Sequence, residues 1–324
     1  MRASGPRAMT PWLLSGLGLL ILLLAGDSLV KGAVNLSLRL GVPALIVSLT
    51  IVAFGTSAPE LLISVQAILE GAPGLALGNV VGSNTANILL VLGVPAILAT
   101  MHTSECNSRK TYIFMIVASL LFIGLAFRGV FDWIAGVTLL AGLTLVLSDA
   151  LRDAHQHRTA CKGDAQEEDP EGADPDMPMW RIAIFLVLGL IGLPVGADLL
   201  VDNATIIAQQ FGVSDTVIGL TMVAIGTSLP ELATTVMAAL RRQADVALGN
   251  VIGSNMFNLL AIIGVASLVG PIPVDPEFLT FDLWVMLGAS ALLFPFVFMK
   301  WNITRAWGIA LSVMYLCYLF VLLA

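Results

Sequence analysis

Long apolar stretches dominate the chain and alternate with short polar connections. A bilayer core about 30 Å thick needs about 20 apolar residues in each spanning helix, and the sequence supplies ten stretches of suitable length. The regular alternation that a transmembrane β-barrel requires is absent from the sequence. The pattern therefore predicts an all-α polytopic membrane protein with ten transmembrane helices. We place them at residues 11–30, 43–69, 74–99, 111–127, 130–148, 181–202, 215–240, 246–269, 279–299 and 306–323.

Two sequence motifs occur twice, each time at an offset of 171 residues. The first, AFGTSAPE at residues 53–60, returns as AIGTSLPE at 224–231, with six of eight residues identical. The second, ALGNVVGSN at 76–84, returns as ALGNVIGSN at 247–255, with eight of nine identical. The chain therefore contains an internal repeat.

Each copy of the repeat contains five predicted spans. Because five is an odd number, the second copy must enter the membrane from the opposite side. We predict two inverted five-helix repeats, at residues 1–148 and 181–324, joined by a linker at 149–180. In transporters, inverted repeats place a binding site near the bilayer midplane, where broken helices of the two halves meet.

The placement of charge orients the chain. Only 11% of the residues are charged, and most of the net charge of −7 comes from the linker, whose acidic run has few apolar residues and is typical of disorder. With the N-terminus outside, 12 of the 15 Lys and Arg residues fall on the inner side, as cytoplasmic loops prefer. We therefore expect a cell-membrane protein with both termini outside and a cytoplasmic linker. We expect no nucleic acid, no cofactor and no obligatory protein partner.

Two glutamates lie well inside apolar spans at equivalent points of the repeats, Glu60 and Glu231. A charge at the centre of a membrane helix costs at least ~2.5–3.5 kcal/mol, so such a residue indicates function by default. No Lys or Arg lies near the centre of the same spans. Because two buried carboxylates repel each other or hold a proton, the pair predicts an external cation as its partner.

The residues before Glu60 predict a break in the helix. Pro59 has no N–H and its ring disturbs the preceding turn, and Gly55 adds freedom, so backbone carbonyls of that turn become available. Thr56 and Ser57 precede Glu60 by four and three residues, which predicts their hydroxyls on the face of its carboxylate. The second repeat has the same features in Gly226, Thr227, Ser228, Pro230 and Glu231. Such an all-oxygen set suits a hard cation, and two bidentate carboxylates plus carbonyls can reach the six to eight oxygens that Ca²⁺ takes.

The second motif adds neutral oxygens. Each repeat has a serine and an asparagine spaced i, i+4 on one helical face, and their hydroxyl and amide oxygens suit Na⁺ around shared carboxylates. These residues are Ser83 and Asn87, then Ser254 and Asn258. Nearby glycines, which let helices approach closely, are Gly78, Gly82, Gly249 and Gly253. Serine and asparagine beside glycine are also common packing residues, so the functional interpretation rests on the presence of both motifs in each repeat.

Intramembrane enzymes and ion channels are two other classes of membrane protein with polar residues inside their spans. An intramembrane zinc protease needs a His-Glu-x-x-His pattern, but the three histidines lie in polar connections and the cysteines lack metal-ligand spacing. An oxygen-lined channel remains an alternative, because filters also use oxygen ligands. Exchange against a counter-ion separates a transporter from a channel, and we expect no enzyme activity.

At these residues the sequence resembles the cation/Ca²⁺ exchanger superfamily, and specifically its prokaryotic Na⁺/Ca²⁺ exchanger branch. The two motifs look like the α-repeats of that family, and the resemblance covers nearly the whole chain. It implies a secondary antiporter that exchanges Na⁺ for Ca²⁺ by alternating access, with the first and sixth spans sliding past a rigid core. An H⁺/Ca²⁺ antiporter or an exchanger of another divalent cation is the alternative.

The resemblance also implies a ligand set. Glu60 and Glu231 would be shared by Ca²⁺ and Na⁺, and Thr56 and Thr227 would join the Ca²⁺ site through backbone oxygens. The Na⁺ sites would be lined by Ala53, Ser57, Ala224 and Ser228, the alanines acting through their carbonyls. The central sites would be completed by Ser83, Asn87, Ser254 and Asn258.

Three departures within the family bear on ion choice and regulation. Some family members have Asp at the position of Asn258, and the K⁺-dependent members resemble that variant. The asparagine in this chain therefore argues against K⁺ co-transport. H⁺-coupled members typically have Gly-Asn where this chain has Gly-Thr at residues 55–56 and 226–227, which favours Na⁺ coupling. Large regulatory Ca²⁺-binding domains do not fit into the short linker.

Overall fold

The computed structural model describes residues 6–104, 106–160, 174, 176–211, 226–276 and 278–323. The first repeat contains α1 (Pro6–Leu40), α2 (Ala44–Val47), η1 (Ser48–Val52), α3 (Ala53–Thr56), α4 (Ala58–Leu69), α5 (Pro73–Ala86), η2 (Asn87–Val91), α6 (Gly93–Leu98), α7 (Arg109–Ala126), β1 (Val130–Phe131) and α8 (Trp133–Ala160). The second contains α9 (Met179–Gln210), α11 (Leu229–Leu240), α12 (Ala244–Met256), η3 (Phe257–Ile262), α13 (Ile263–Val269), β2 (Ile272–Pro273), η4 (Phe278–Asp282), α14 (Leu283–Ala291), α15 (Phe294–Phe298) and α16 (Arg305–Leu323). The η segments are π-helical turns.

The helices confirm an all-α membrane protein. Over the described residues, eight helices are long and apolar enough to cross a bilayer, and the bent run from Ala44 to Leu69 makes a ninth span. The predicted span at 215–240 is described only in its second part, as α11, because residues 212–225 lie outside the described ranges. The count of ten helices therefore stays a prediction.

Several helices extend beyond the predicted spans. Helix α1 continues to Leu40 and carries Lys31 and Arg39, which we expected in a loop. Helix α8 continues to Ala160, so the first part of the predicted linker is helical and its Asp149 and Asp153 pair with Lys110 of α7. These extensions arise because a helix need not end where its apolar stretch ends. The acidic run that begins at Asp164 lies outside the described residues.

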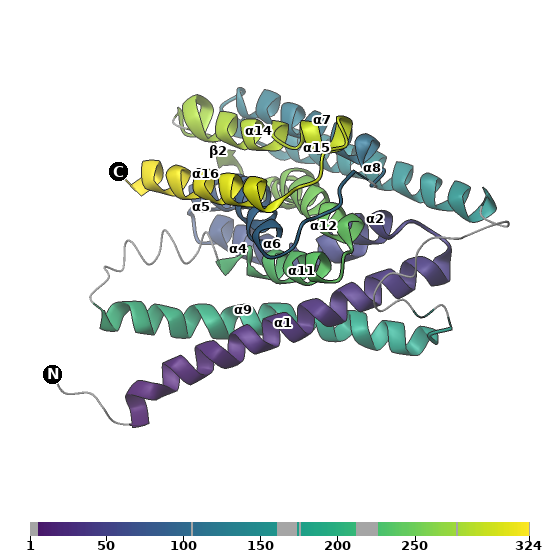
Figure 1. Ribbon diagram of the computed structural model, residues 1–324. Coiled ribbons are helices and arrows are strands. Elements are labelled where there is room, and N and C mark those ends of the chain that lie inside the picture. The colour runs from purple at the N-terminus through teal and green to yellow at the C-terminus, as the bar shows by residue number, and fades with distance from the viewer. Residues whose placement is uncertain are drawn as a thin grey trace.

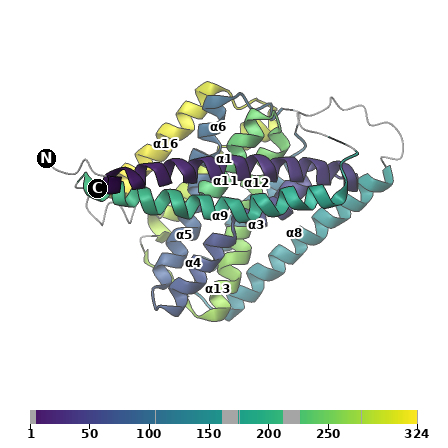
Figure 2. The same cartoon turned by 90° about the horizontal axis from the view of Figure 1, so that it is seen from below.

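The two long first helices of the repeats, α1 and α9, lie side by side along one face of the molecule (Figures 1 and 2). Their axes come close at glycines: a Cβ on Gly18 would lie 2.7 Å from the backbone nitrogen of Leu200, and one on Gly189 would lie 2.5 Å from the Cβ of Leu29. Small residues at such crossings let backbones meet in a membrane. The pair therefore forms a layer of its own against the remaining helices.

Helices α5 and α12 form the centre of the remaining bundle and are its most buried spans. The repeats exchange their last helices around this centre, since α8 packs on α13 while α16 packs on α6 (Figure 2). The strands β1 and β2 join the two repeats in a short antiparallel pair, with Val130 opposite Pro273 and Phe131 opposite Ile272.

The central helices meet in a reciprocal contact. The side-chain amide of Asn84 donates to the carbonyl of Asn255 (3.2 Å), and that of Asn255 donates to the carbonyl of Asn84 (3.3 Å). Because these residues are equivalent in the two repeats, each repeat presents the same surface to the other. Such a self-complementary contact is typical of a two-fold relation between two like units.

Close approach of the second repeat to the first confirms part of the glycine prediction. A Cβ on Gly249 would lie 2.8 Å from the carbonyl oxygen of Leu45, and one on Gly253 would lie 2.6 Å from the carbonyl oxygen of Leu49. The positions equivalent to these neighbours, opposite Gly78 and Gly82, fall at residues 216–220, outside the described part of the chain. Helix α12 thus lies directly against η1 and α3.

Candidate cation site

The predicted helix break is present in both repeats. Helix α3 ends at Thr56, Ser57 has φ −86° and ψ 3°, and α4 starts at Ala58 with a bend of 42°. In the second repeat Ser228 has nearly the same angles, −85° and 2°, before α11. Proline fits the first turn of the new helix, where its missing N–H has no helical partner in any case. Ala224 lies outside the described residues.

The breaks place Glu60 in the first turn of α4 and Glu231 in the first turn of α11. The first turn of a helix has unpaired N–H groups and the positive end of the helix dipole, which favour a carboxylate. Both side chains are buried, with 1% and 0% of their surface exposed. They lie close enough for the charge of Glu231 to act on Glu60. Among the described residues, no Lys, Arg or His forms an ion pair with either.

One oxygen of Glu231 is held by two serines from different repeats. Ser57 donates to Oε1 at 3.2 Å and Ser254 donates to it at 3.4 Å. We expected the Ser57 hydroxyl on the face of Glu60 of its own repeat, and the hydrogen bond that it donates goes to Glu231 of the other repeat. Spacing of three residues places side chains on one face only within a continuous helix, and the helix breaks at Ser57.

A threonine of each repeat also contacts a serine of the other repeat, and the two contacts are equivalent. The hydroxyls of Thr56 and Ser254 are 3.4 Å apart, and those of Ser83 and Thr227 are 3.4 Å apart. Four of the predicted site residues are thus brought together in two matching pairs. Each pair joins a helix break of one repeat to the central helix of the other.

The carbonyl of Ala53 is less available than predicted. It accepts the N–H of Ser57 at 3.0 Å, so the turn before the break keeps this helical bond. The carbonyl of Gly55 is the one whose helical donor would be residue 59, and Pro59 has no N–H to offer. The freed carbonyl is therefore that of Gly55, within the turn that the sequence predicted, and the Ala53 oxygen, which has two lone pairs, can still accept a second contact.

Both asparagines of the predicted central sites stand where an α-helix changes to a π-helical turn. Asn87 begins η2, and Asn258 lies in η3. Such turns are rare and frequently occur at functional sites. Asn87 donates to the side-chain oxygen of Asn255 at 3.0 Å, so its amide nitrogen is held while its oxygen stays available.

Several buried oxygens have no hydrogen-bond partner within the described part of the chain. Six of them lie in or shortly after the two repeated motifs, namely Glu60 Oε2, Glu231 Oε2, Ser228 Oγ, Asn84 Oδ1, Asn87 Oδ1 and Asn258 Oδ1, while the hydroxyls of Ser15, Ser108 and Ser312 lie elsewhere in the chain. A buried polar atom without a partner costs about 1–3 kcal/mol, so a set of six calls for an explanation. Five of the six belong to the predicted ligand set. A hard cation would supply the missing contacts.

Sequence reasoning missed the asparagines at the start of the second motif. Asn79 donates to the carbonyl of Glu60 (3.3 Å) and to Ser64 (3.2 Å), while Asn250 donates to the carbonyl of Glu231 (3.3 Å) and to Thr235 (3.1 Å). Each ties the first turn after a break to the central helix of its own repeat. Their identity in both copies of the motif was the available signal.

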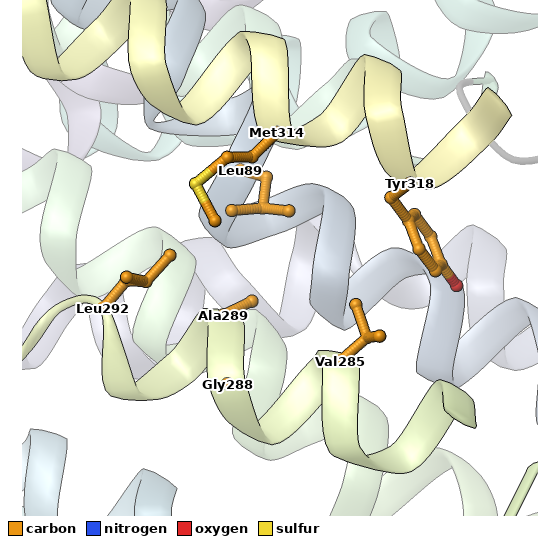
Figure 3. Close-up of a pocket in the computed structure, with 7 residues that line it drawn as sticks. All are labelled: Leu89, Val285, Gly288, Ala289, Leu292, Met314 and Tyr318. Atoms are coloured by element: carbon orange, nitrogen blue, oxygen red, sulfur yellow. The ribbon is translucent and has the colours of Figure 1, made fainter. Parts of the chain in front are cut away.

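A separate pocket of about 370 Å³ lies between η2, α14 and α16 (Figure 3). Its lining is apolar apart from the hydroxyl of one tyrosine: Leu89, Val285, Gly288, Ala289, Leu292, Met314 and Tyr318. Such a lining offers no ligand set for a cation.

Comparison with known proteins identifies the family. The family described as "sodium/calcium exchanger protein" matches residues 10–148 and 181–324. The chain belongs to the sodium/calcium exchanger family. Among relatives of the exchanger, the sodium/calcium exchanger MaX1 of Methanosarcina acetivorans is 33% identical, with 94% of this chain and 96% of that protein aligned. The putative antiporter CaxA of Alkalimonas amylolytica is 38% identical over 85% of this chain and 86% of its own.

Solved structures of the sodium–calcium exchanger NCX_Mj have the same fold as this exchanger. One of them, soaked with Na⁺ and Sr²⁺, matches with a TM-score of 0.80 and 32% identity, over 95% of this chain and 97% of that one. The protein is therefore a multi-pass membrane transporter that exchanges Ca²⁺ against another cation. Recognition of the family from its two repeats is confirmed.

Proposed function

We propose that this exchanger is a Na⁺/Ca²⁺ antiporter that uses the Na⁺ gradient to extrude Ca²⁺. The observation that carries the proposal is the buried pair Glu60 and Glu231, each with one unpartnered carboxylate oxygen and neither with a basic partner in the described part of the chain. Two uncompensated carboxylates away from water are unfavourable. A cation held between them removes that penalty.

The oxygen atoms around the two glutamates favour metal ions, rather than protons alone, as the bound species. Hydroxyls from both repeats already converge on Oε1 of Glu231, and the unpartnered oxygens of Asn87 and Asn258 are neutral. Neutral oxygens around two carboxylates suit either one Ca²⁺ or several Na⁺ ions. We assign the ligand set to Glu60, Glu231, Thr56, Thr227, Ser57, Ser228, Ala53, Ala224, Ser83, Ser254, Asn87 and Asn258.

Competition for shared carboxylates explains obligatory exchange. Ca²⁺ and Na⁺ would occupy the same oxygens in turn, so one must leave before the other binds. An empty site would carry two uncompensated charges through the low-dielectric transition between its two open states, which is costly. Only an occupied site would cross readily.

The proposal includes the orientation inferred from basic residues, with both termini outside and the linker, residues 149–180, cytoplasmic. Residues 1–148 and 181–324 would be the two inverted halves. The site would then open alternately on either side of the contact between α5 and α12.

Uptake of radiolabelled Ca²⁺ into proteoliposomes tests the coupling. Vesicles loaded with Na⁺ and diluted into Na⁺-free buffer should accumulate Ca²⁺, while K⁺-loaded vesicles should not. Uptake that is unaffected by replacing Na⁺ with K⁺ but driven by a pH gradient would instead establish an H⁺/Ca²⁺ antiporter, since buried carboxylates also take protons.

Replacement of either glutamate tests the shared site. Glu60→Gln and Glu231→Gln keep the shape of the side chain but remove its charge, so each should abolish exchange. A variant of matched burial outside the site, Ser119→Ala, should leave it unchanged. Normal transport by either glutamine variant would overturn the model of shared ligands.

A further inference from the structure

Asn250 joins the two halves of the site without being one of its assigned ligands. It lies in α12, is fully buried, and uses both hydrogens of its amide nitrogen, toward the carbonyl of Glu231 (3.3 Å) and the hydroxyl of Thr235 (3.1 Å). Thr235 in turn donates to the same Glu231 carbonyl at 2.7 Å. These contacts determine which way the amide points.

The oxygen of that amide faces the other repeat. Oδ1 of Asn250 accepts the hydroxyl of Thr56 at 3.3 Å, at the last residue before the first helix break. One side chain thus ties the backbone of Glu231 to the turn that leads to Glu60. The bridge runs beside the Ser254 hydroxyl, which lies 3.4 Å from the Thr56 hydroxyl and 3.4 Å from Glu231 Oε1.

We propose that Asn250 is a positioning residue that sets the Ca²⁺ affinity of the exchanger by holding Thr56 and Glu231 at a fixed separation. The inference rests on the proposed function. A site that must match one ion loses affinity when a supporting hydrogen bond is removed, because the ligands are no longer held in place.

The test is a double-mutant cycle between Asn250→Ala and Thr56→Val, read as the KM and maximal rate of Ca²⁺ uptake. Each single variant should raise the KM by about tenfold, the equivalent of one hydrogen bond, and the double variant should be no worse than the poorer single one. Thr235→Val, which loosens the same bridge, should raise the KM by less. Asn203→Ala removes a buried amide far along α9 and serves as the control.

Other outcomes are decisive. Additive effects, or a lower maximal rate with an unchanged KM in Thr235→Val and Asn250→Ala, would show that Asn250 only supports folding. If Asn250→Ala does not fold, Thr235→Val and Thr56→Val still give the comparison. Failure of wild-type vesicles to couple Ca²⁺ to Na⁺ would overturn the proposed function instead, and the KM for Ca²⁺ could still be measured with the true counter-ion.

A second, independent observation concerns an ion pair between α1 and α11. Asp27, in the second half of α1, binds Arg241 at the end of α11 and also Lys31 one turn further on, at 3.2 Å. Next to it, a Cβ on Gly26 would lie 3.0 Å from the carbonyl oxygen of Ala233. Helix α1 is therefore tied by charge and by close packing to the helix that begins with Glu231.

The equivalent residues of the other repeat cannot form this pair. At the offset of 171 residues, Asp27 corresponds to Asp198, Lys31 to Asp202 and Arg241 to Glu70, so all three are acidic. The side chains of Asp198 and Asp202 are exposed, and Glu70 accepts a bond from Gln66 of its own helix. Inverted repeats place the two clusters near opposite surfaces of the membrane.

We propose that the Asp27–Arg241 pair is a latch that stabilises the conformation with α1 against α11. An antiporter must move part of its bundle to expose the site on the other side, and α1 with α9 forms a separate layer. The equivalent residues of the other repeat are all acidic, so closure at the other end of the site has no such latch. Taken with the proposed orientation, the latch lies at the cytoplasmic end and favours the outward-open state.

Hydrogen exchange of residues 232–243 in lipid nanodiscs tests the latch. Asp27→Asn and Arg241→Gln should speed the exchange of this segment by about fivefold, the effect of losing one partly exposed ion pair, and Arg241→Lys should retain most of the protection. Glu70→Arg installs a possible partner for Asp198 and should shift protection toward residues 61–72.

Asp132→Asn is the matched control. It weakens the Arg128–Asp132 pair at the start of α8, where the Ala135 N–H also binds Asp132. Unchanged exchange in both Asp27→Asn and Arg241→Gln, or equal changes in Asp132→Asn, would overturn the latch. Exchange rates are measured without transport, so this result does not depend on which ion drives uptake.

Discussion

Gly253 is the position where one added carbon should have the largest effect on the site. A Cβ there would lie 2.6 Å from the Cβ of Ala53 and 2.6 Å from the carbonyl oxygen of Leu49. Carbon atoms in contact normally stay about 3.5–4.0 Å apart, so Gly253→Ala must separate α12 from η1 and α3 by about 1 Å. Overpacking of this kind costs about 1–3 kcal/mol.

The same displacement reaches the cation site. Ser254 follows Gly253 and lies 3.4 Å from Glu231 Oε1 and 3.4 Å from the hydroxyl of Thr56. A shift of about 1 Å takes either contact beyond hydrogen-bond distance. Gly253→Ala should therefore lower both the unfolding temperature and the rate of Ca²⁺ exchange.

Thermal unfolding of the purified protein in detergent, together with uptake into vesicles, measures both effects. Gly124→Ala is the matched control, because a Cβ at Gly124 in α7 would meet no atom within 4 Å. Alanine is favoured over glycine within a helix by roughly 0.5–1 kcal/mol, so the control should be slightly more stable. Equal stability and transport in Gly253→Ala and wild type would refute the close crossing of α12 on α3.

Three further predictions concern binding and stability. Ca²⁺ at 100 times its Kd should stabilise the wild type by about 2.7 kcal/mol, and calorimetry should show no such gain in Glu231→Gln. Ser57→Ala removes one donor to Glu231 and should weaken ion binding by about fivefold, measured by titration with both ions; an unchanged affinity would argue against the cross-repeat contact. Arg242 has φ 56°, where the first repeat has Gly71 at φ 75°. Because the left-handed region costs a non-glycine residue about 1 kcal/mol, Arg242→Gly should raise the unfolding temperature, and a decrease would contradict this assignment of strain.

The sequence predicted a helix break before Glu60 and the burial of Glu60 because both depend on local chemistry. Proline has no N–H wherever it stands, and a carboxylate within an apolar span faces the bundle interior because exposure to lipid is costly. The sequence did not predict how far α1 extends, because apolar length reports the thickness of the membrane and says little about where a helix ends. Nor did it reveal that the Ala53 carbonyl keeps its helical bond.

Partners across the repeats were beyond prediction. Ser57 was expected beside Glu60, three residues away, yet it donates to Glu231 at a separation of 174 residues. Asn250 is identical in both copies of the second motif, but its hydrogen bond to Thr56 depends on how α12 crosses α3. The pairing of Asp27 with Arg241 needed the same knowledge of helix packing.

By itself, the sequence determined the membrane class, the family and the two acidic residues, since apolar length and an exact repeat of reactive groups survive without coordinates. Only the tertiary structure decided which oxygens meet, because contacts between broken helices depend on crossing geometry set by small residues such as Gly249 and Gly253. The difference between the Asp27–Arg241 ion pair and its acidic counterparts depends on both. The sequence shows which residues are charged, and the fold shows that Asp27 and Arg241 are in contact.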